Sequence, residues 1–149
     1  LFETTLRFTL TSSFLMTRLV APGMIARGGG VVLNISSATG HVRSRGFLAY
    51  GTAKAALDHM TRLLGTELAP KVRVNAINPG YTSTPMQDAE YSPEMLRRVN
   101  GIIPMRRHGR PEEIAGLYVY LASDEAAYAT GGIFTFDGAE SVGSAATTL

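Results

Sequence analysis

A serine, a tyrosine and a lysine in the first third of the chain have the types and spacing for proton chemistry. Ser37 follows a short apolar run, and Tyr50 and Lys54 come later, four residues apart. On a helix, that spacing puts Tyr50 and Lys54 on one face, where the lysine ammonium favours the phenolate and equips the tyrosine to give or take a proton. A carbonyl that is reduced to an alcohol needs this proton donor and a second group that holds its oxygen, and Ser37 can supply the second.

A tyrosine and a lysine at this spacing also occur by chance on many helix surfaces, so the setting matters. The run 31–35 (VVLNI) is brief, apolar and rich in β-branched residues, with glycines before it and Ser36-Ser37 after it. It predicts a buried parallel strand. Ser37 then lies at the carboxyl end of that strand, where open parallel sheets bind their ligands. The segment 75–85 (NAINPGYTSTP) is predicted to cover the end of the next strand and the turn after it.

Taken together, these motifs resemble those of the short-chain dehydrogenase/reductase family, which combines a strand-end serine, Tyr-x-x-x-Lys and a later Pro-Gly segment. The resemblance extends from about Phe8 to Ala139. It implies that Tyr50 is the general acid or base and that Ser37 orients the substrate carbonyl. It also implies that Lys54 binds the ribose hydroxyls of a nicotinamide cofactor, either NAD or NADP.

The resemblance assigns further cofactor contacts to the Pro-Gly segment. Pro79 and Gly80 would cross over the nicotinamide, and Thr82 and Thr84 would meet its carboxamide. The alternative is a simple strand-to-helix turn in which Thr84 caps the helix before Pro85.

The candidate substrate contacts lie in the loops that follow the strands. Thr39 and His41 follow Ser37, although exposed loop residues are often polar for no functional reason. The segment 86–108 is long and mostly polar, so we expect it to form a substrate lid. The expected contacts in and around this segment are Tyr81, Met86, Tyr91, Met95 and Ile103.

One position departs from the family pattern. The helix before the serine strand carries an asparagine in family members, and it completes a proton relay to solvent. Thr9 occupies that position here, in the stretch TLTSSF. A threonine hydroxyl lacks the reach and the paired donor and acceptor of a carboxamide, so the relay is in doubt while Ser37, Tyr50 and Lys54 are unaffected.

The elements that position these residues alternate between helix and strand. We expect helices over about 2–25, from 46 or 47 to 68, and from 110 to about 122, with strands over 31–35, 72–77 and 133–136. This order predicts an α/β fold: a single domain, residues 1–149, with a parallel sheet covered by helices on both faces. It corresponds to the second half of a doubly wound, Rossmann-like sheet.

The chain has two glycine-rich stretches, 28–30 and 138–143, and neither fits a nucleotide-binding loop. Gly28–Gly30 precedes a strand, whereas a phosphate loop lies between a strand and a helix. After Gly143 the sequence SAATTL has no amphipathic pattern, so it reads as a C-terminal tail. We therefore expect the nucleotide-binding half to belong to a longer protein, since an unpaired apolar strand edge at Val31 would favour aggregation.

Composition limits the remaining possibilities. The net charge of +2, from 14 basic and 12 acidic residues, argues against nucleic acid or an anionic membrane as a partner. Cysteine is absent, which fits a reducing cytoplasm and excludes thiolate metal sites; the three scattered histidines predict no metal site either. No apolar run is long enough for a membrane span. By resemblance we expect a homodimer or homotetramer built through the first two long helices. The competing hypothesis is a non-catalytic half-domain, or a degenerate family member, that acts as a binding or assembly module.

Overall fold

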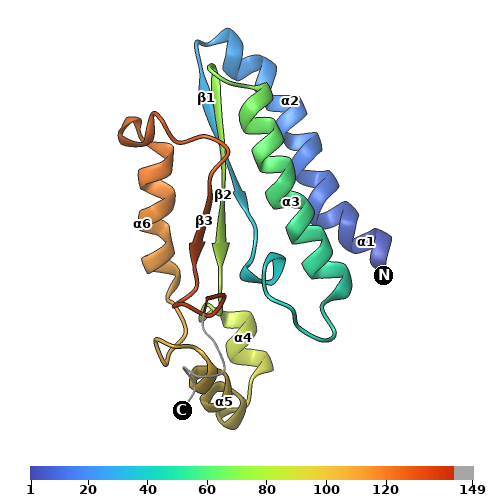
Figure 1. Ribbon diagram of the computed structural model, residues 1–149, viewed down its shortest axis with the longest axis vertical. Helices are drawn as coiled ribbons and strands as arrows, with labels where there is room; N and C mark the ends of the chain where they lie inside the picture. Colours follow the sequence, from blue (N-terminus) through green and yellow to red (C-terminus); the bar gives the residue numbers. More distant parts are fainter. Residues whose placement is uncertain (143–149) are drawn as a thin grey trace.

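A computed structural model describes residues 1–142 of the chain (Figure 1). The tail expected after Gly143 lies outside the described residues. The elements, in chain order, are α1 (Phe2–Leu6), the π-helical turn η1 (Arg7–Thr11), α2 (Ser12–Ala26), β1 (Gly30–Ile35), the 3-10 turn η2 (Ala38–Gly40), α3 (Leu48–Glu67), β2 (Val72–Pro79), α4 (Pro85–Glu90), α5 (Pro93–Ile102), α6 (Pro111–Ala122), the 3-10 turn η3 (Asp124–Ala126) and β3 (Ile133–Phe136).

The strands form one parallel sheet with the order β1-β2-β3. Val32 pairs with Val74, and Ile77 pairs with Phe134, so the apolar residues of neighbouring strands lie in line. Helices α2 and α3 lie side by side on one face, and α6 covers the other (Figure 1). The α/β fold predicted from the alternation of helix and strand is confirmed.

The two faces of the sheet bury different side chains. Towards α6, the core consists of Ile77, Ile114, Leu121 and Ala126, with Leu33 and Phe134 packed against it. Alternate residues of β2 point the other way. Val74, Ala76 and Asn78 are fully buried there, and Asn78 bonds to a side chain of α3.

A line of hydrogen bonds joins the two helices on the α3 face to the sheet. Ser13 of α2 donates to the side-chain oxygen of Asn34 at 2.6 Å, and the Asn34 amide donates to Thr61 of α3 at 2.9 Å. Asn34 and Thr61 are buried, so each polar group needs its partner. These bonds fix how α2 and α3 sit on β1, and α3 carries the tyrosine and the lysine.

The observed elements differ from expectation in three places. The first helix ends at Ala26, close to its expected end, but it contains the unexpected π-helical turn η1. Strand β2 extends to Pro79, two residues beyond its predicted end. The segment expected to be a polar lid contains the helices α4 and α5, which begin at side-chain caps: Thr84 accepts from the Gln87 amide at 3.4 Å, and Ser92 accepts from the Met95 amide at 3.2 Å.

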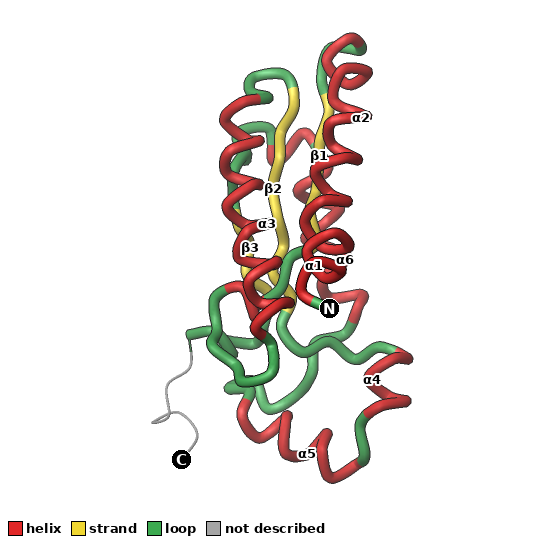
Figure 2. The backbone as a smooth tube through the Cα atoms, turned by 90° about the vertical axis from the view of Figure 1, so that its right-hand side faces the viewer, coloured by secondary structure: helices red, strands yellow, loops and turns green. Residues whose placement is uncertain are grey.

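The carboxyl ends of the strands form the open end of the molecule. Helices α4 and α5 lie beyond that end (Figure 2). At the end of the edge strand β1, Ile35 exposes 62% of its surface, whereas isoleucine is among the residues most often buried. Within residues 1–142, no helix has both the length and the apolar character that crossing a membrane requires.

Candidate active site

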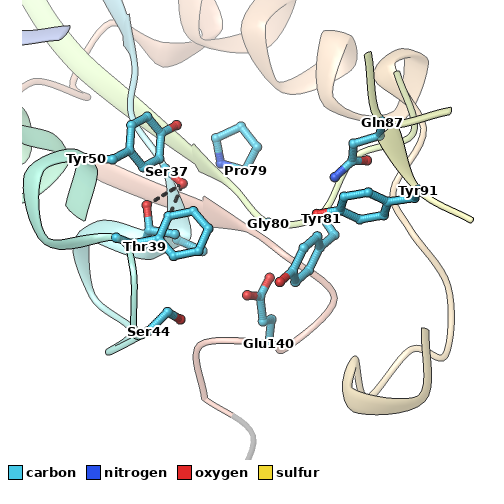
Figure 3. A pocket seen from close by; sticks show the side chains of 12 residues that line it. Ser37, Thr39, Ser44, Tyr50, Pro79, Gly80, Tyr81, Gln87, Tyr91 and Glu140 are labelled. Atoms are coloured by element: carbon cyan, nitrogen blue, oxygen red, sulfur yellow. Dashed lines mark hydrogen bonds between the residues drawn. The ribbon is translucent and has the colours of Figure 1, made fainter. Parts of the chain in front are cut away.

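Ser37 is held in place at the carboxyl end of β1. Its backbone is extended and its hydroxyl oxygen caps η2, accepting from the Thr39 amide at 3.2 Å and from the Thr39 hydroxyl at 2.9 Å (Figure 3). Just before it, Ser36 donates to the main-chain oxygen of Lys54 at 3.2 Å. The end of β1 is therefore tied directly to the helix that carries Tyr50 and Lys54.

Tyr50 and Lys54 lie on the same face of the first two turns of α3. The Lys54 ammonium is 5.4 Å from the centre of the Tyr50 ring and donates to the main-chain oxygen of Ile35 at 2.7 Å. Burial lowers the pKa of Lys54, and the nearby carboxylate of Asp58 opposes this shift. The Tyr50 side chain is partly open to solvent, so its hydroxyl is accessible to a ligand.

Ser37 and Tyr50 line a pocket at the open end of the sheet, and Lys54 lies behind the Tyr50 ring (Figure 3). Ser37, Thr39 and Tyr50 form one side, Pro79 and Gly80 cross behind it, and the far side is made by Tyr81, Gln87, Tyr91 and Glu140. A second cleft shares Ser37, Tyr50 and Gly80 with this pocket and extends towards α6. Ser37 and Tyr50 thus stand where the two cavities meet.

A buried carboxylate joins the elements behind the site. Asp58 of α3 accepts a hydrogen bond from the Asn78 amide at 3.0 Å, and the same oxygen is 3.1 Å from Nε2 of His41. A Cβ at Gly40 would lie 3.2 Å from this oxygen, so the loop after Ser37 packs closely against Asp58. Asp58 therefore holds together the η2 loop, α3 and the end of β2.

The comparisons with known proteins agree with this arrangement. Residues 1–139 match the model of a family described as enoyl-(acyl carrier protein) reductase. The chain is 42% identical to acetoacetyl-CoA reductase of Cupriavidus necator over 130 residues, 87% of this chain and 52% of that protein. It is 38% identical to 3-oxoacyl-(acyl-carrier-protein) reductase FabG of Thermotoga maritima over 138 residues, 91% of this chain and 55% of that protein.

The chain belongs to the short-chain dehydrogenase/reductase family. It superposes on a short-chain type dehydrogenase/reductase from Mycobacterium ulcerans with a TM-score of 0.88 and 31% identity, covering 95% of this chain and 52% of that one. A 7α-hydroxysteroid dehydrogenase solved with NADH and 7-oxo glycochenodeoxycholic acid gives a TM-score of 0.83 and 34% identity, covering 87% and 51%. The chain thus spans about half the length of the relatives it matches.

The cleft beside Tyr50 has the surface that a nicotinamide needs. Ile35, Ile114 and Tyr118 give it apolar walls, and Thr82 and Thr84 lie along its rim. A side chain at Gly80 would come within 2.7 Å of Asp137 and of Glu140, so the main chain can pass closely there only as glycine. The residues present therefore fit the nicotinamide cofactor of a short-chain dehydrogenase/reductase.

The structure brings some of the expected substrate residues to the pocket and leaves others out. Thr39, Tyr81 and Tyr91 line it. His41 does not line the pocket beside Ser37, because its ring is directed to Asp58. Met86 and Met95 are exposed on α4 and α5, and Ile103 is buried in the core.

The sequence did not indicate several residues that line the pocket, among them Phe47, Gln87 and Glu140. Phe47 meets the Tyr50 ring edge to face, with ring centres 6.4 Å apart. Glu140 had a usable signal, since it follows β3 and the carboxyl ends of parallel strands converge on one site. The sequence carries no comparable signal for Asp58, which lies behind the pocket, because its neighbours in the sequence form an ordinary helix pattern.

Proposed function

We propose that this chain is the catalytic part of an NAD(P)-dependent oxidoreductase that interconverts a ketone and a secondary alcohol. The observation that supports this proposal is that Ser37 and Tyr50 line one pocket at the carboxyl end of a parallel sheet, with the Lys54 ammonium 5.4 Å from the centre of the Tyr50 ring. The activity belongs to the longer protein, which would supply the first βαβαβ half of the nucleotide-binding sheet beside β1. The exposed Ile35 marks the edge where that half would join.

The three side chains have separate tasks in this proposal. In the direction of reduction, Ser37 donates a hydrogen bond to the carbonyl oxygen, and Tyr50 transfers its proton to that oxygen as the carbon accepts a hydride. Lys54 stabilises the phenolate that remains and holds the ribose of the cofactor. The bound cofactor supplies the hydride for reduction and takes it back when the alcohol is oxidised.

The cofactor and the substrate would occupy the two adjoining cavities. We assign the nicotinamide to the cleft bordered by Pro79, Gly80, Thr82 and Thr84. The Thr84 oxygen caps α4, but its hydroxyl hydrogen remains able to donate to a carboxamide. The substrate then lies in the pocket beside Thr39 and Tyr81, and segment 86–108, with α4 and α5, forms a lid at the open end.

Two further proposals concern partners and location. An apolar hollow crosses the outer surface of the paired helices, lined by Leu10, Thr11, Phe14, Ala56, His59, Met60 and Leu63. A second copy of the chain would cover this surface in a homodimer or homotetramer, as we expect for a short-chain dehydrogenase/reductase. We also propose a cytoplasmic location, since cysteine is absent from the chain.

The decisive experiment uses the full-length protein that contains this chain. NADH and NADPH are titrated separately while nicotinamide fluorescence is followed, and cofactor turnover is then measured with a panel of ketones and secondary alcohols. Saturable binding of at least one cofactor together with turnover supports the proposal. Full-length protein that binds neither cofactor would instead be a non-catalytic module.

A further inference from the structure

The turn after β3 is a rigid loop that places one carboxylate in the pocket. Both oxygens of Asp137 accept main-chain hydrogen bonds inside this loop, from Ala139 at 2.9 Å and from Ser141 at 2.7 Å. Gly138 and Ala139 have φ angles of 62° and 70°. The left-handed conformation costs an alanine roughly 1 kcal/mol, so the surrounding contacts must hold it in place. Glu140, the next residue, is consequently presented at a defined position.

The Glu140 carboxylate is incompletely paired. It lines the same pocket as Ser37 and Tyr50 (Figure 3), and its Oε2 atom is buried without a hydrogen-bond partner among residues 1–142. Burial raises the pKa of Glu140 and so does Asp137, while a hydrogen bond from the Tyr81 main chain opposes them. A carboxylate can accept several hydrogen bonds, so a ligand in the pocket that brings a donor would gain one at Glu140.

The rest of the pocket strengthens the case for a donor on the ligand. Gln87 also lines the pocket, and its Oε1 atom is buried without a partner in the described part of the chain. The other described lining residues are uncharged: Ser37, Ala38, Thr39, Ser44, Phe47, Tyr50, Pro79, Gly80, Tyr81 and Tyr91. Among the described residues that line the pocket, Glu140 therefore has no cation beside it, and a negatively charged substrate group would meet it uncompensated.

We infer that Glu140 selects substrates that carry an additional hydroxyl group besides the reacting carbonyl or alcohol. That hydroxyl donates to the Glu140 carboxylate where it lines the pocket, and substrates with a carboxylate at the same position are disfavoured by repulsion. The inference rests on the proposed oxidoreductase function and adds a substrate class to it. Glu140 acts here through recognition and takes no part in the transfer of the proton or the hydride.

The test compares three alcohols built on one ring in the full-length protein, with NAD or NADP as the oxidant: cyclohexanol, 1,4-cyclohexanediol and 4-hydroxycyclohexanecarboxylate. For the unmodified protein, we expect kcat/KM to be highest for the diol and lowest for the carboxylate. In Glu140→Leu, the preference for the diol over cyclohexanol should fall by about 10-fold, since a hydrogen bond to a charged acceptor is lost. In Glu140→Gln, an acceptor remains, so that preference should largely persist while the rejection of the carboxylate is relieved.

A matched control removes a glutamate elsewhere. Glu125 is exposed on η3, at the far end of α6 from the pocket, and Glu125→Leu should leave both ratios unchanged. If cyclohexanol is oxidised and both ratios are the same in Glu140→Leu as in the unmodified protein, the assignment of Glu140 fails and the proposed function stands. If none of the three alcohols is oxidised although the titration shows cofactor binding, the inference about Glu140 fails, and the wider panel of ketones and alcohols still decides the oxidoreductase proposal. If neither cofactor binds, the oxidoreductase proposal itself fails.

Discussion

The carboxylate of Asp58 accepts a hydrogen bond from the side-chain amide of Asn78 at 3.0 Å, across the contact between α3 and β2. Both side chains are almost completely buried. Asp58 lies one helical turn after Lys54, and Asn78 immediately precedes Pro79 and Gly80. The bond therefore couples the helix that carries the proton-transfer residues to the segment that borders both cavities.

Replacement of Asp58 should destabilise the protein. In Asp58→Ala, the buried Asn78 amide loses its acceptor and His41 loses its partner, so we expect the free energy of unfolding to fall by about 3 kcal/mol. Asp58→Asn retains an acceptor oxygen and should cost roughly 1 kcal/mol. Urea denaturation measures both, with Asp124→Ala on the exposed turn η3 as the control. An Asp58→Ala variant as stable as the control would contradict this account.

Tyr50→Phe should abolish turnover and leave the affinity for the cofactor nearly unchanged. The substitution removes the hydroxyl that transfers the proton and keeps the ring against Phe47 and Lys54. Loss of a general acid typically lowers a rate by about 100-fold to 10,000-fold. Steady-state kinetics and cofactor fluorescence are measured in parallel in the full-length protein. Tyr128→Phe, at a fully exposed tyrosine, is the matched control; turnover by Tyr50→Phe at the control's rate would refute the assignment.

Lys54→Ala should weaken cofactor binding and slow the reaction together. The ammonium is held between the Ile35 carbonyl and the Tyr50 ring, so its removal takes away both the expected ribose contact and the positive charge beside the phenol. We expect about a 10-fold loss of cofactor affinity, the equivalent of one hydrogen bond from a charged group. Fluorescence titration tests this, with the exposed Lys71→Ala as the control. An unchanged titration curve would count against the ribose role.

The parts of the fold that follow from local patterns were predictable. The apolar run before Ser37 and the spacing of Tyr50 and Lys54 were enough to predict a strand end that faces a helix. The start of α4 was given only as the alternative in which Thr84 caps a helix before Pro85. Helix α5 was missed, although Ser92-Pro93 has the form of an N-cap followed by proline at the first helical position. The polar composition outweighed that signal.

Other features depend on contacts between distant parts of the chain. Asp58 looks like any polar residue in a helical pattern until the fold brings Asn78 and His41 to it. The same is true of Ala139, because the residues around it in the sequence do not indicate the positive φ angle that it adopts. His41 was expected in the substrate pocket because it follows Ser37, but the turn η2 carries it past the pocket to Asp58.

Thr9→Asn restores the residue of the family pattern and should leave activity equal or higher. Thr9 lies within the π-helical turn η1, a form of backbone that often marks functional positions in helices. An asparagine there regains the carboxamide that the proton relay of the family uses. The turnover number of the full-length protein is measured beside Thr4→Asn, an exposed position one turn earlier. A clear loss of rate would show that the threonine is itself required.

The start of α6 should lose stability in acid through a single glutamate. Glu113 accepts two hydrogen bonds from Arg107, both at 2.8 Å, and one from the Arg110 main chain at 2.8 Å. The Arg107 bonds, followed by the Arg110 amide, lower the pKa of Glu113 to about 2 from its usual 4.5. Because the pKa is lower in the folded state, the stabilisation is complete above about pH 4.5 and is lost as the pH falls towards 2.

Glu113→Gln should therefore have a lower Tm than the unmodified protein at neutral pH, and the difference should close as the pH approaches 2. The effect should be modest and should shrink in high salt, because Arg107 is solvent-exposed. Differential scanning calorimetry across this pH range measures it. Glu112→Gln, at the neighbouring exposed glutamate, serves as the control and should show a smaller difference. A Tm difference that stays constant from neutral pH to pH 2 would mean that the Glu113 carboxylate is not held in its charged form by Arg107.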